Sequence, residues 1–128
     1  MPRHEESSHQ QAFFQWLKLY PDVFKVTWHT PNSGKRTKFE AYRLKREGLL
    51  KGVPDIFIGI AINGFHGYFI ELKSKKGKVD PSQKKLHLNL IDNGYKVDVC
   101  YSWHEARSNL LQYLKGSKYD VRLHAVPE

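Results

Sequence analysis

Two short apolar segments on either side of an Asn-Gly dipeptide constrain the possible fold more than any other feature. Residues 55–61 and 68–73 are rich in β-branched and aromatic side chains, which favours extended strands. Asn63-Gly64 between them accepts positive φ at both positions, as a tight hairpin turn requires. The pattern predicts an antiparallel hairpin, so the start of the first strand should lie beside the end of the second.

Helices and strands alternate before this hairpin. Apolar residues at helical spacing predict a helix over residues 5–19, ended before Pro21. The next segment is predicted to be a strand because it contains four β-branched or aromatic residues, Val23, Phe24, Val26 and Trp28. Residues 29–38 have the composition of a loop. A short helix is predicted over residues 39–47, ending at Gly48.

A capping box opens the element after the hairpin. Asp80 is the predicted N-cap, Pro81 the first helical residue and Gln83 the partner that closes the box. Gly94 is the predicted stop. The apolar face of this helix is predicted to contain Leu86, Leu90 and Ile91.

A last strand and helix complete the expected fold. The strand covers residues 96–101, the helix runs from 102 to about 114, and a short strand is predicted at 121–123. The order α-β-α-β-β-α-β-α indicates a single α/β domain of residues 1–128, with a mixed sheet flanked by helices and a core in about 6–115.

Composition limits the classes of function. The chain has 128 residues and a formal net charge of +8, with a sequence pI of about 9.6. This excess favours a polyanionic partner, either nucleic acid or an anionic membrane surface. The single cysteine, Cys100, cannot form an internal disulfide and is expected to be a buried, inert thiol. With no transmembrane segment or signal peptide in the sequence, we expect a soluble intracellular protein.

Three charged residues fall at the same end of the predicted hairpin. Glu71 and Lys73 are two residues apart in a strand, so they point to the same face. Asp55 opens the neighbouring strand and should converge with them. Taken singly, Glu71 and Lys73 could form a surface ion pair, and Asp55 could be a turn residue after Pro54.

Two carboxylates held together repel each other unless a cation lies between them. Hard oxygen ligands of this kind suit Mg²⁺ or Mn²⁺. Such a metal can polarise a phosphate and activate a bound water. Lys73 would then orient or deprotonate the water, or offset negative charge on the phosphate. The trio therefore predicts a metal-dependent nuclease.

The ordered motifs resemble the VRR-NUC group of the PD-(D/E)XK nuclease superfamily. Gly52-Val53-Pro54-Asp55 precedes a strand, and Glu71-Leu72-Lys73 ends the next one. The other matching positions are Glu6, Gln10 and Trp16 in the first helix, the loop Pro31-Asn32-Ser33-Gly34, and Gly77, Ser82-Gln83 and Gly94. The resemblance spans about residues 6–106.

This resemblance implies a restriction-endonuclease-like core that hydrolyses DNA phosphodiesters with Mg²⁺ or Mn²⁺. It implies that Asp55 and Glu71 are metal ligands, that Leu72 contributes its backbone carbonyl and that Lys73 is the catalytic lysine. Glu6 would be a further acidic group near the metal, with Glu5 as the alternative. In this family the position of Gln83 borders the site, although its capping-box role explains it equally well.

Basic residues near the motifs are the predicted DNA contacts. Together with one loop asparagine they are Asn32, Lys35, Arg36, Lys38, Arg43, Lys51, Lys75, Lys76 and Lys78. Some of them could be no more than solvated surface charges. No added reader domain is evident, so we expect recognition of DNA shape or backbone.

Stand-alone members of the group, often from phages, look like homodimeric resolvases. We therefore expect a homodimer that cuts branched DNA such as four-way (Holliday) junctions in DNA repair, in the bacterial cytoplasm if the source is a phage or prophage. The alternative is a non-catalytic or partner-dependent DNA-binding module with the same fold. The histidines show no metal-ligand spacing, which argues against a histidine metal site.

Overall fold

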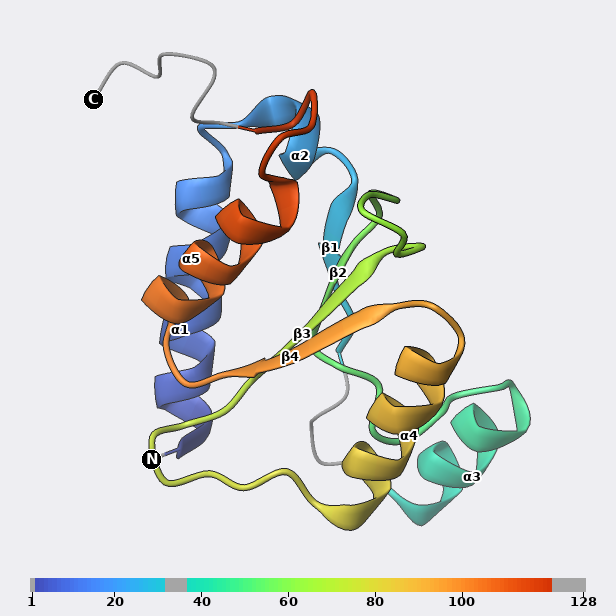
Figure 1. Cartoon of the computed structure of the whole chain (residues 1–128). Helices are drawn as coiled ribbons and strands as arrows, with labels where there is room; N and C mark the ends of the chain where they lie inside the picture. Colours follow the sequence, from blue (N-terminus) through green and yellow to red (C-terminus); the bar gives the residue numbers. More distant parts are fainter. Residues whose placement is uncertain (1, 32–36, 121–128) are drawn as a thin grey trace.

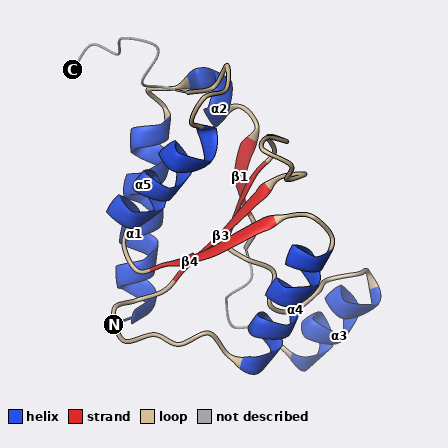
Figure 2. Cartoon of the chain, viewed as in Figure 1, coloured by secondary structure: helices blue, strands red, loops and turns tan. Residues whose placement is uncertain are grey.

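A four-stranded mixed sheet lies at the centre of the protein. The computed structural model describes residues 2–31 and 37–120. The strands are β1 (Thr27–His29), β2 (Ile56–Ile58), β3 (Tyr68–Leu72) and β4 (Lys96–Cys100), in the order β1-β2-β3-β4 (Figure 2). β1 and β3 both pair antiparallel with β2, whereas β3 pairs parallel with β4. The predicted α/β fold with a mixed sheet is confirmed.

The hairpin predicted from Asn63-Gly64 is present between β2 and β3. Asn63 has a φ of 53° and Gly64 a φ of 85°, the left-handed conformation that both residue types tolerate. Ile62 and Phe65 form an antiparallel bridge across the turn. This turn determines the register in which Ile56 faces Ile70.

Helices cover the two faces of the sheet unequally. α1 (Pro2–Leu17) and α5 (Trp103–Leu114) lie together on one face, and α4 (Pro81–Asp92) lies on the other (Figure 1). The alternating strand residues Tyr68, Ile70 and Leu72 are buried in the core. Phe13 and Leu17 of α1 and Leu110 and Leu114 of α5 belong to the same core. No helix in the described ranges is long and apolar enough to cross a membrane.

The α4 capping box forms as predicted. The Asp80 carboxylate accepts from the Gln83 N–H at 2.9 Å, and the Gln83 side-chain oxygen accepts from the Asp80 N–H at 3.1 Å. The predicted apolar face is only partly right, because Ile91 is half exposed. His87 is the buried residue of α4, since the helix turns this side chain toward the sheet at the end where Glu71 lies.

The sequence prediction was wrong about the start of the first strand. Val23 and Phe24 belong to a short helix, α2 (Pro21–Phe24), and the strand begins only at Thr27. Pro21 sets the φ of the first helical residue, and the turn buries Val23 in the core. Burial of the Val23 side chain therefore favours a helical turn over a strand at residues 21–24. The strand predicted at 121–123 lies outside the described residues.

α3 (Lys38–Arg46) forms close to the predicted range and buries none of its residues. Thr37 caps its N-terminus by accepting from the Glu40 N–H at 3.0 Å. Gly48 follows the helix with a φ of 104°, consistent with the predicted stop.

Gly52, three residues before Asp55, lies against the first turn of α4. Its φ is 93°, and a Cβ there would approach the Gln83 Cα to 3.2 Å and the Ser82 carbonyl oxygen to 3.3 Å. A side chain at this position would therefore push the 52–54 turn away from α4. The close contact fixes Asp55 relative to the helix that carries Gln83.

We expect Gly52→Ala to lower the free energy of unfolding more than Gly48→Ala does. Both glycines have positive φ, so both substitutions carry a backbone cost, but a Cβ at Gly48 would meet nothing within 4 Å. The clash at Gly52 should add about 1–3 kcal/mol. Urea unfolding of the two variants measures the difference, and equal losses would contradict the close contact.

Candidate active site

Asp55 is held opposite Glu71 by the pairing of β2 with β3. The register Ile56↔Ile70 continues by one residue to Asp55 and Glu71. The Asp55 backbone carbonyl accepts from the Thr30 N–H at 2.7 Å, and its side-chain Oδ2 accepts from the Leu72 N–H at 2.8 Å. Asp55 is therefore anchored to both neighbouring strands, and the predicted convergence of the two carboxyl groups is present.

Glu71 is buried with three polar neighbours. Its side chain is on the α4 face of β3 and the residue is only 3% exposed. Oε2 accepts from the Gln83 amide at 3.4 Å and lies 3.9 Å from the Lys73 Nζ. Oε1 lies 3.8 Å from the His87 Nε2, beyond hydrogen-bond range, and has no hydrogen-bond partner. One oxygen of a buried carboxylate is thus left unsatisfied.

Burial makes both carboxyls reluctant to ionise, and the charge of Glu71 adds to this effect at Asp55. Loss of solvation, followed by the charge of Glu71, raises the pKa of Asp55 to about 7. Loss of solvation also raises the pKa of Glu71 to about 7, against the opposing effects of a hydrogen bond with the Asp55 side chain and of the Lys73 charge. Near neutral pH, a cation that enters this site replaces protons that the carboxyls would otherwise hold.

The donor set suits a hard divalent cation. Asp55 and Glu71 offer carboxylate oxygens, and the unsatisfied Oε1 of Glu71 is an available lone-pair donor. The N–H and C=O of one strand residue point to the same side. The Leu72 carbonyl therefore faces the side of β3 from which the Leu72 N–H reaches Asp55. Across the described residues, no group of three or more His, Cys, Asp or Glu side chains is arranged to hold a metal ion.

The first helix contributes Glu6 to the edge of the site. Its Oε2 accepts from the Ser74 N–H at 3.2 Å, which attaches α1 to the chain just after Lys73. The charge of Glu6 also disfavours ionisation of Glu71 and so helps to raise its pKa. Glu5 is exposed and makes no such contact. Of the two acidic residues considered from the sequence, the structure brings Glu6 to the site.

Gln83 uses both ends of its amide. Its oxygen closes the α4 capping box at the Asp80 N–H, and its nitrogen donates to Glu71. The two roles inferred from the sequence are therefore compatible, because the first turn of α4 lies at the end of β3. This arrangement orients Oε2 of Glu71.

His87 lies at the site, although the sequence did not predict it there. This buried side chain lies one helical turn after Gln83 and faces Glu71 from the same side of α4. Burial, followed by the charge of Lys73, lowers the pKa of His87, so its imidazole is neutral at neutral pH. The buried Nε2 has no hydrogen-bond partner. The four-residue spacing from Gln83 is the signal that could have revealed it.

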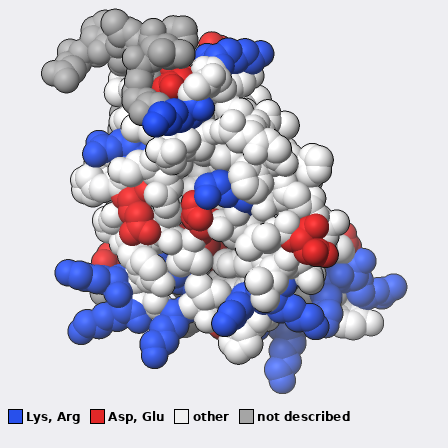
Figure 3. Space-filling model, in the orientation of Figure 1, with Lys and Arg blue, Asp and Glu red and all other residues white. Residues whose placement is uncertain are grey.

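Basic side chains are exposed in the loops next to the site and on α3. Lys51, Lys75, Lys76 and Lys78 are exposed in the loops before β2 and after β3, and Lys38 and Arg43 are exposed on α3. Figure 3 shows Lys and Arg gathered along the lower edge of the molecule, where Figure 1 draws the loop after β3, the start of α4, and α3. Asn32, Lys35 and Arg36, also predicted as DNA contacts, lie outside the described residues.

We expect Asp55→Asn to stabilise the protein at pH 8 in the presence of EDTA. The pKa of Asp55 is about 7 in the folded protein, above the ordinary 3.8, so the folded state holds this proton more tightly than the unfolded chain does. The free energy of unfolding therefore falls as the pH rises through this range. Asparagine avoids the loss and can still accept from the Leu72 N–H. The Tm should rise by several degrees at pH 8, since about 1 kcal/mol corresponds to roughly 4 °C here, and little at pH 4.5.

The exposed carboxylate of Asp92 on α4 provides the matched control for this comparison. Asp92→Asn should change the Tm little and similarly at the two pH values. A Tm of Asp55→Asn below that of the unsubstituted protein at pH 8 would contradict the raised pKa of Asp55.

Comparison with known proteins agrees with the predicted family and fold. The chain matches the family described as the VRR-NUC domain over residues 4–104. A solved structure titled VRR_NUC domain protein is 28% identical and superimposes with a TM-score of 0.74, over 88% of this chain and 90% of that one. No curated protein matches the sequence. The chain belongs to the VRR-NUC domain family, which implies a nuclease of the PD-(D/E)XK type with DNA as its substrate.

Proposed function

We propose that this protein is a metal-dependent deoxyribonuclease whose active site consists of Asp55, Glu71 and Lys73. The observation that carries the proposal is the convergence of the partly buried carboxyl of Asp55 with the buried carboxyl of Glu71, which has an unsatisfied oxygen, beside a lysine. A protein that only bound DNA would gain nothing from carboxylates that repel phosphate. The exposed lysines around the site supply the opposite charge that a DNA backbone requires.

Each residue has a distinct task in this proposal. Asp55, Glu71 and the Leu72 carbonyl would hold Mg²⁺ or Mn²⁺. The bound ion supplies Lewis-acid polarisation of the phosphate and a water of lowered pKa. The Lys73 ammonium, 3.9 Å from Glu71, orients the attacking water and offsets charge that develops on the phosphate. Gln83 orients Glu71 through its amide, and Glu6 attaches the segment after Lys73 to α1.

Lys73→Met should lower kcat by about 10²–10³-fold, because the variant loses the charge beside the reacting phosphate. Asp55→Asn should have an effect at least as large, and EDTA should abolish cleavage. The assay follows hydrolysis of labelled DNA with Mg²⁺ or Mn²⁺. Lys118→Met is the control, since Lys118 is an exposed lysine that stacks on Tyr119 near the end of the described chain.

Two outcomes would refute this assignment. Cleavage that continues in EDTA, or that survives both active-site substitutions, would place the chemistry elsewhere. Tight DNA binding without any cleavage by the unsubstituted protein would instead support a non-catalytic or partner-dependent DNA-binding module.

We further propose that the enzyme is a homodimer that prefers branched DNA and acts inside the cell. A dimer of this small domain would have two active sites, one in each protomer, and could therefore cut both strands at one branch point. The exposed basic residues recognise backbone, which gives no sequence preference but allows selection by shape.

The dimer and its substrate preference can be tested together. Sedimentation at assay concentration should give twice the mass of the 15.0 kDa chain. Four-way junctions should be cut at least tenfold faster than linear duplexes of the same sequence. A monomer that cuts both substrates equally would contradict the proposal.

A further inference from the structure

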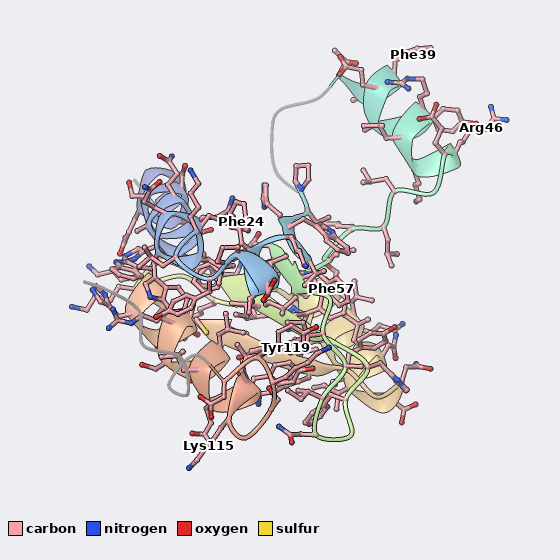
Figure 4. All side chains as sticks on the ribbon, turned by 90° about the horizontal axis from the view of Figure 1, so that it is seen from above. Phe24, Phe39, Arg46, Phe57, Lys115 and Tyr119 are labelled. Carbon is pink, nitrogen blue, oxygen red and sulfur yellow. The ribbon has the colours of Figure 1, made fainter. Side chains whose placement is uncertain are left out.

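α3 presents two large aromatic rings to solvent. Phe39 is 75% exposed and Tyr42 is 62% exposed. They are three residues apart, so they lie on the same side of the helix. Figure 4 shows α3 standing apart from the other elements, with Phe39 and Arg46 labelled on it. Exposed aromatic surface of this kind on a helix that contributes nothing to the core indicates a binding surface.

The same helix carries a concentrated positive charge. α3 and its C-cap carry four basic residues, Lys38, Arg43, Lys45 and Arg46, against two acidic ones, Glu40 and Glu47, so residues 38–47 have a net charge of +2. The Arg46 guanidinium lies 5.7 Å from the centre of the Tyr42 ring. Five side chains line an open hollow of about 330 Å³ there: Phe39, Tyr42, Arg43, Arg46 and Glu47. Arg43 pairs with Glu47 at 3.1 Å in an exposed contact, which is weak enough to exchange for a phosphate.

We propose that this face of α3 binds unpaired bases of the DNA substrate by stacking them on Phe39 and Tyr42, while its basic residues contact the adjacent phosphates. The inference rests on the proposed function and adds to it the part of the substrate that α3 recognises. Aromatic rings beside basic side chains form the typical surface for single-stranded nucleic acid, because every base has a π-face and every nucleotide a negative charge. Duplex bases are already stacked and cannot reach such rings.

Charge selects nucleic acid over a second copy of this chain as the occupant. Two α3 helices placed face to face, each with its C-cap Glu47, would each bring a net charge of +2, and this like-charge contact would be unfavourable. A polyanion is attracted by the same charge.

The position of α3 allows it to contact the DNA that occupies the active site. Arg46 ends the helix nine residues before Asp55, and a chain of this length spans at most about 30 Å. This distance is less than one turn of duplex DNA, about 34 Å. An unpaired segment beside a branch point could thus reach α3 while the phosphodiester next to it lies at the active site.

Binding without cleavage separates the two proposals. Lys73→Met protein is titrated with single-stranded DNA that contains the fluorescent adenine analogue 2-aminopurine, and with linear duplex of the same sequence. In this background, Phe39→Leu combined with Tyr42→Leu should weaken single-strand binding by about tenfold or more. Duplex binding and the salt dependence should stay unchanged, and the 2-aminopurine fluorescence should no longer be quenched on binding.

Matched variants distinguish ring stacking from other contributions. Tyr42→Phe keeps the ring and should bind single strands as the parent does. Arg43→Ala combined with Arg46→Ala should weaken both DNA forms and reduce the salt dependence, because phosphate contacts are lost. Leucine retains apolar bulk and favours helix, and α3 buries no residue, so the double leucine variant is expected to fold.

Three results with the double leucine variant would overturn the inference. It could bind single-stranded DNA as well as the parent does, or lose affinity equally for single-stranded and duplex DNA. It could also sediment as a monomer where the parent is a dimer. The last result would identify the surface as a contact between two copies. If the unsubstituted protein shows ring-dependent single-strand binding but no nuclease activity, only the proposed function fails. If nuclease activity is present and the rings make no difference, only the α3 inference fails.

Discussion

The rest of the site depends on the antiparallel pairing of β2 with β3. This pairing places Asp55 opposite Glu71 and lets the Leu72 N–H bind the Asp55 carboxylate at 2.8 Å. A slip of one residue would turn every side chain of one strand to the other face, separating the carboxyls and exposing the core residues Ile56 and Ile58. The core and the site therefore require the same register, and the Asn63-Gly64 turn supports both.

Burial of the Glu71 carboxyl opposes folding. Glu71 has a positive neighbour in Lys73, an amide donor in Gln83 and a neutral imidazole in His87. These groups do not satisfy both of its oxygens. Loss of solvation raises the pKa of both Asp55 and Glu71 to about 7, and the charge of Glu71 adds to the shift of Asp55. The stability that the core supplies is thus partly used to hold like charges together, as expected at a functional site.

The sequence predicted correctly those features that depend on residues close together in the chain. The Asn63-Gly64 hairpin, the Asp80 capping box and the alternation that puts Glu71 and Lys73 on one face each depend on neighbours in the chain. Features that depend on distant packing were not predictable in this way. Val23 becomes helical because its turn buries it in the core. His87, rather than Ile91, is buried because α4 crosses the sheet at Glu71. The separation of α3 from the body has no sequence signal except its exposed aromatic residues.

Because α3 buries none of its side chains, its sequence contributes little to the free energy of folding beyond helix propensity. Gly52 fixes the chain against α4 only after α3 has ended. The residues that face outward on α3 can therefore be exchanged without moving Asp55 or Glu71. In evolutionary terms, the surface of α3 and the Asp55–Glu71 site are separable in this molecule, and selection can alter the first while the second stays intact.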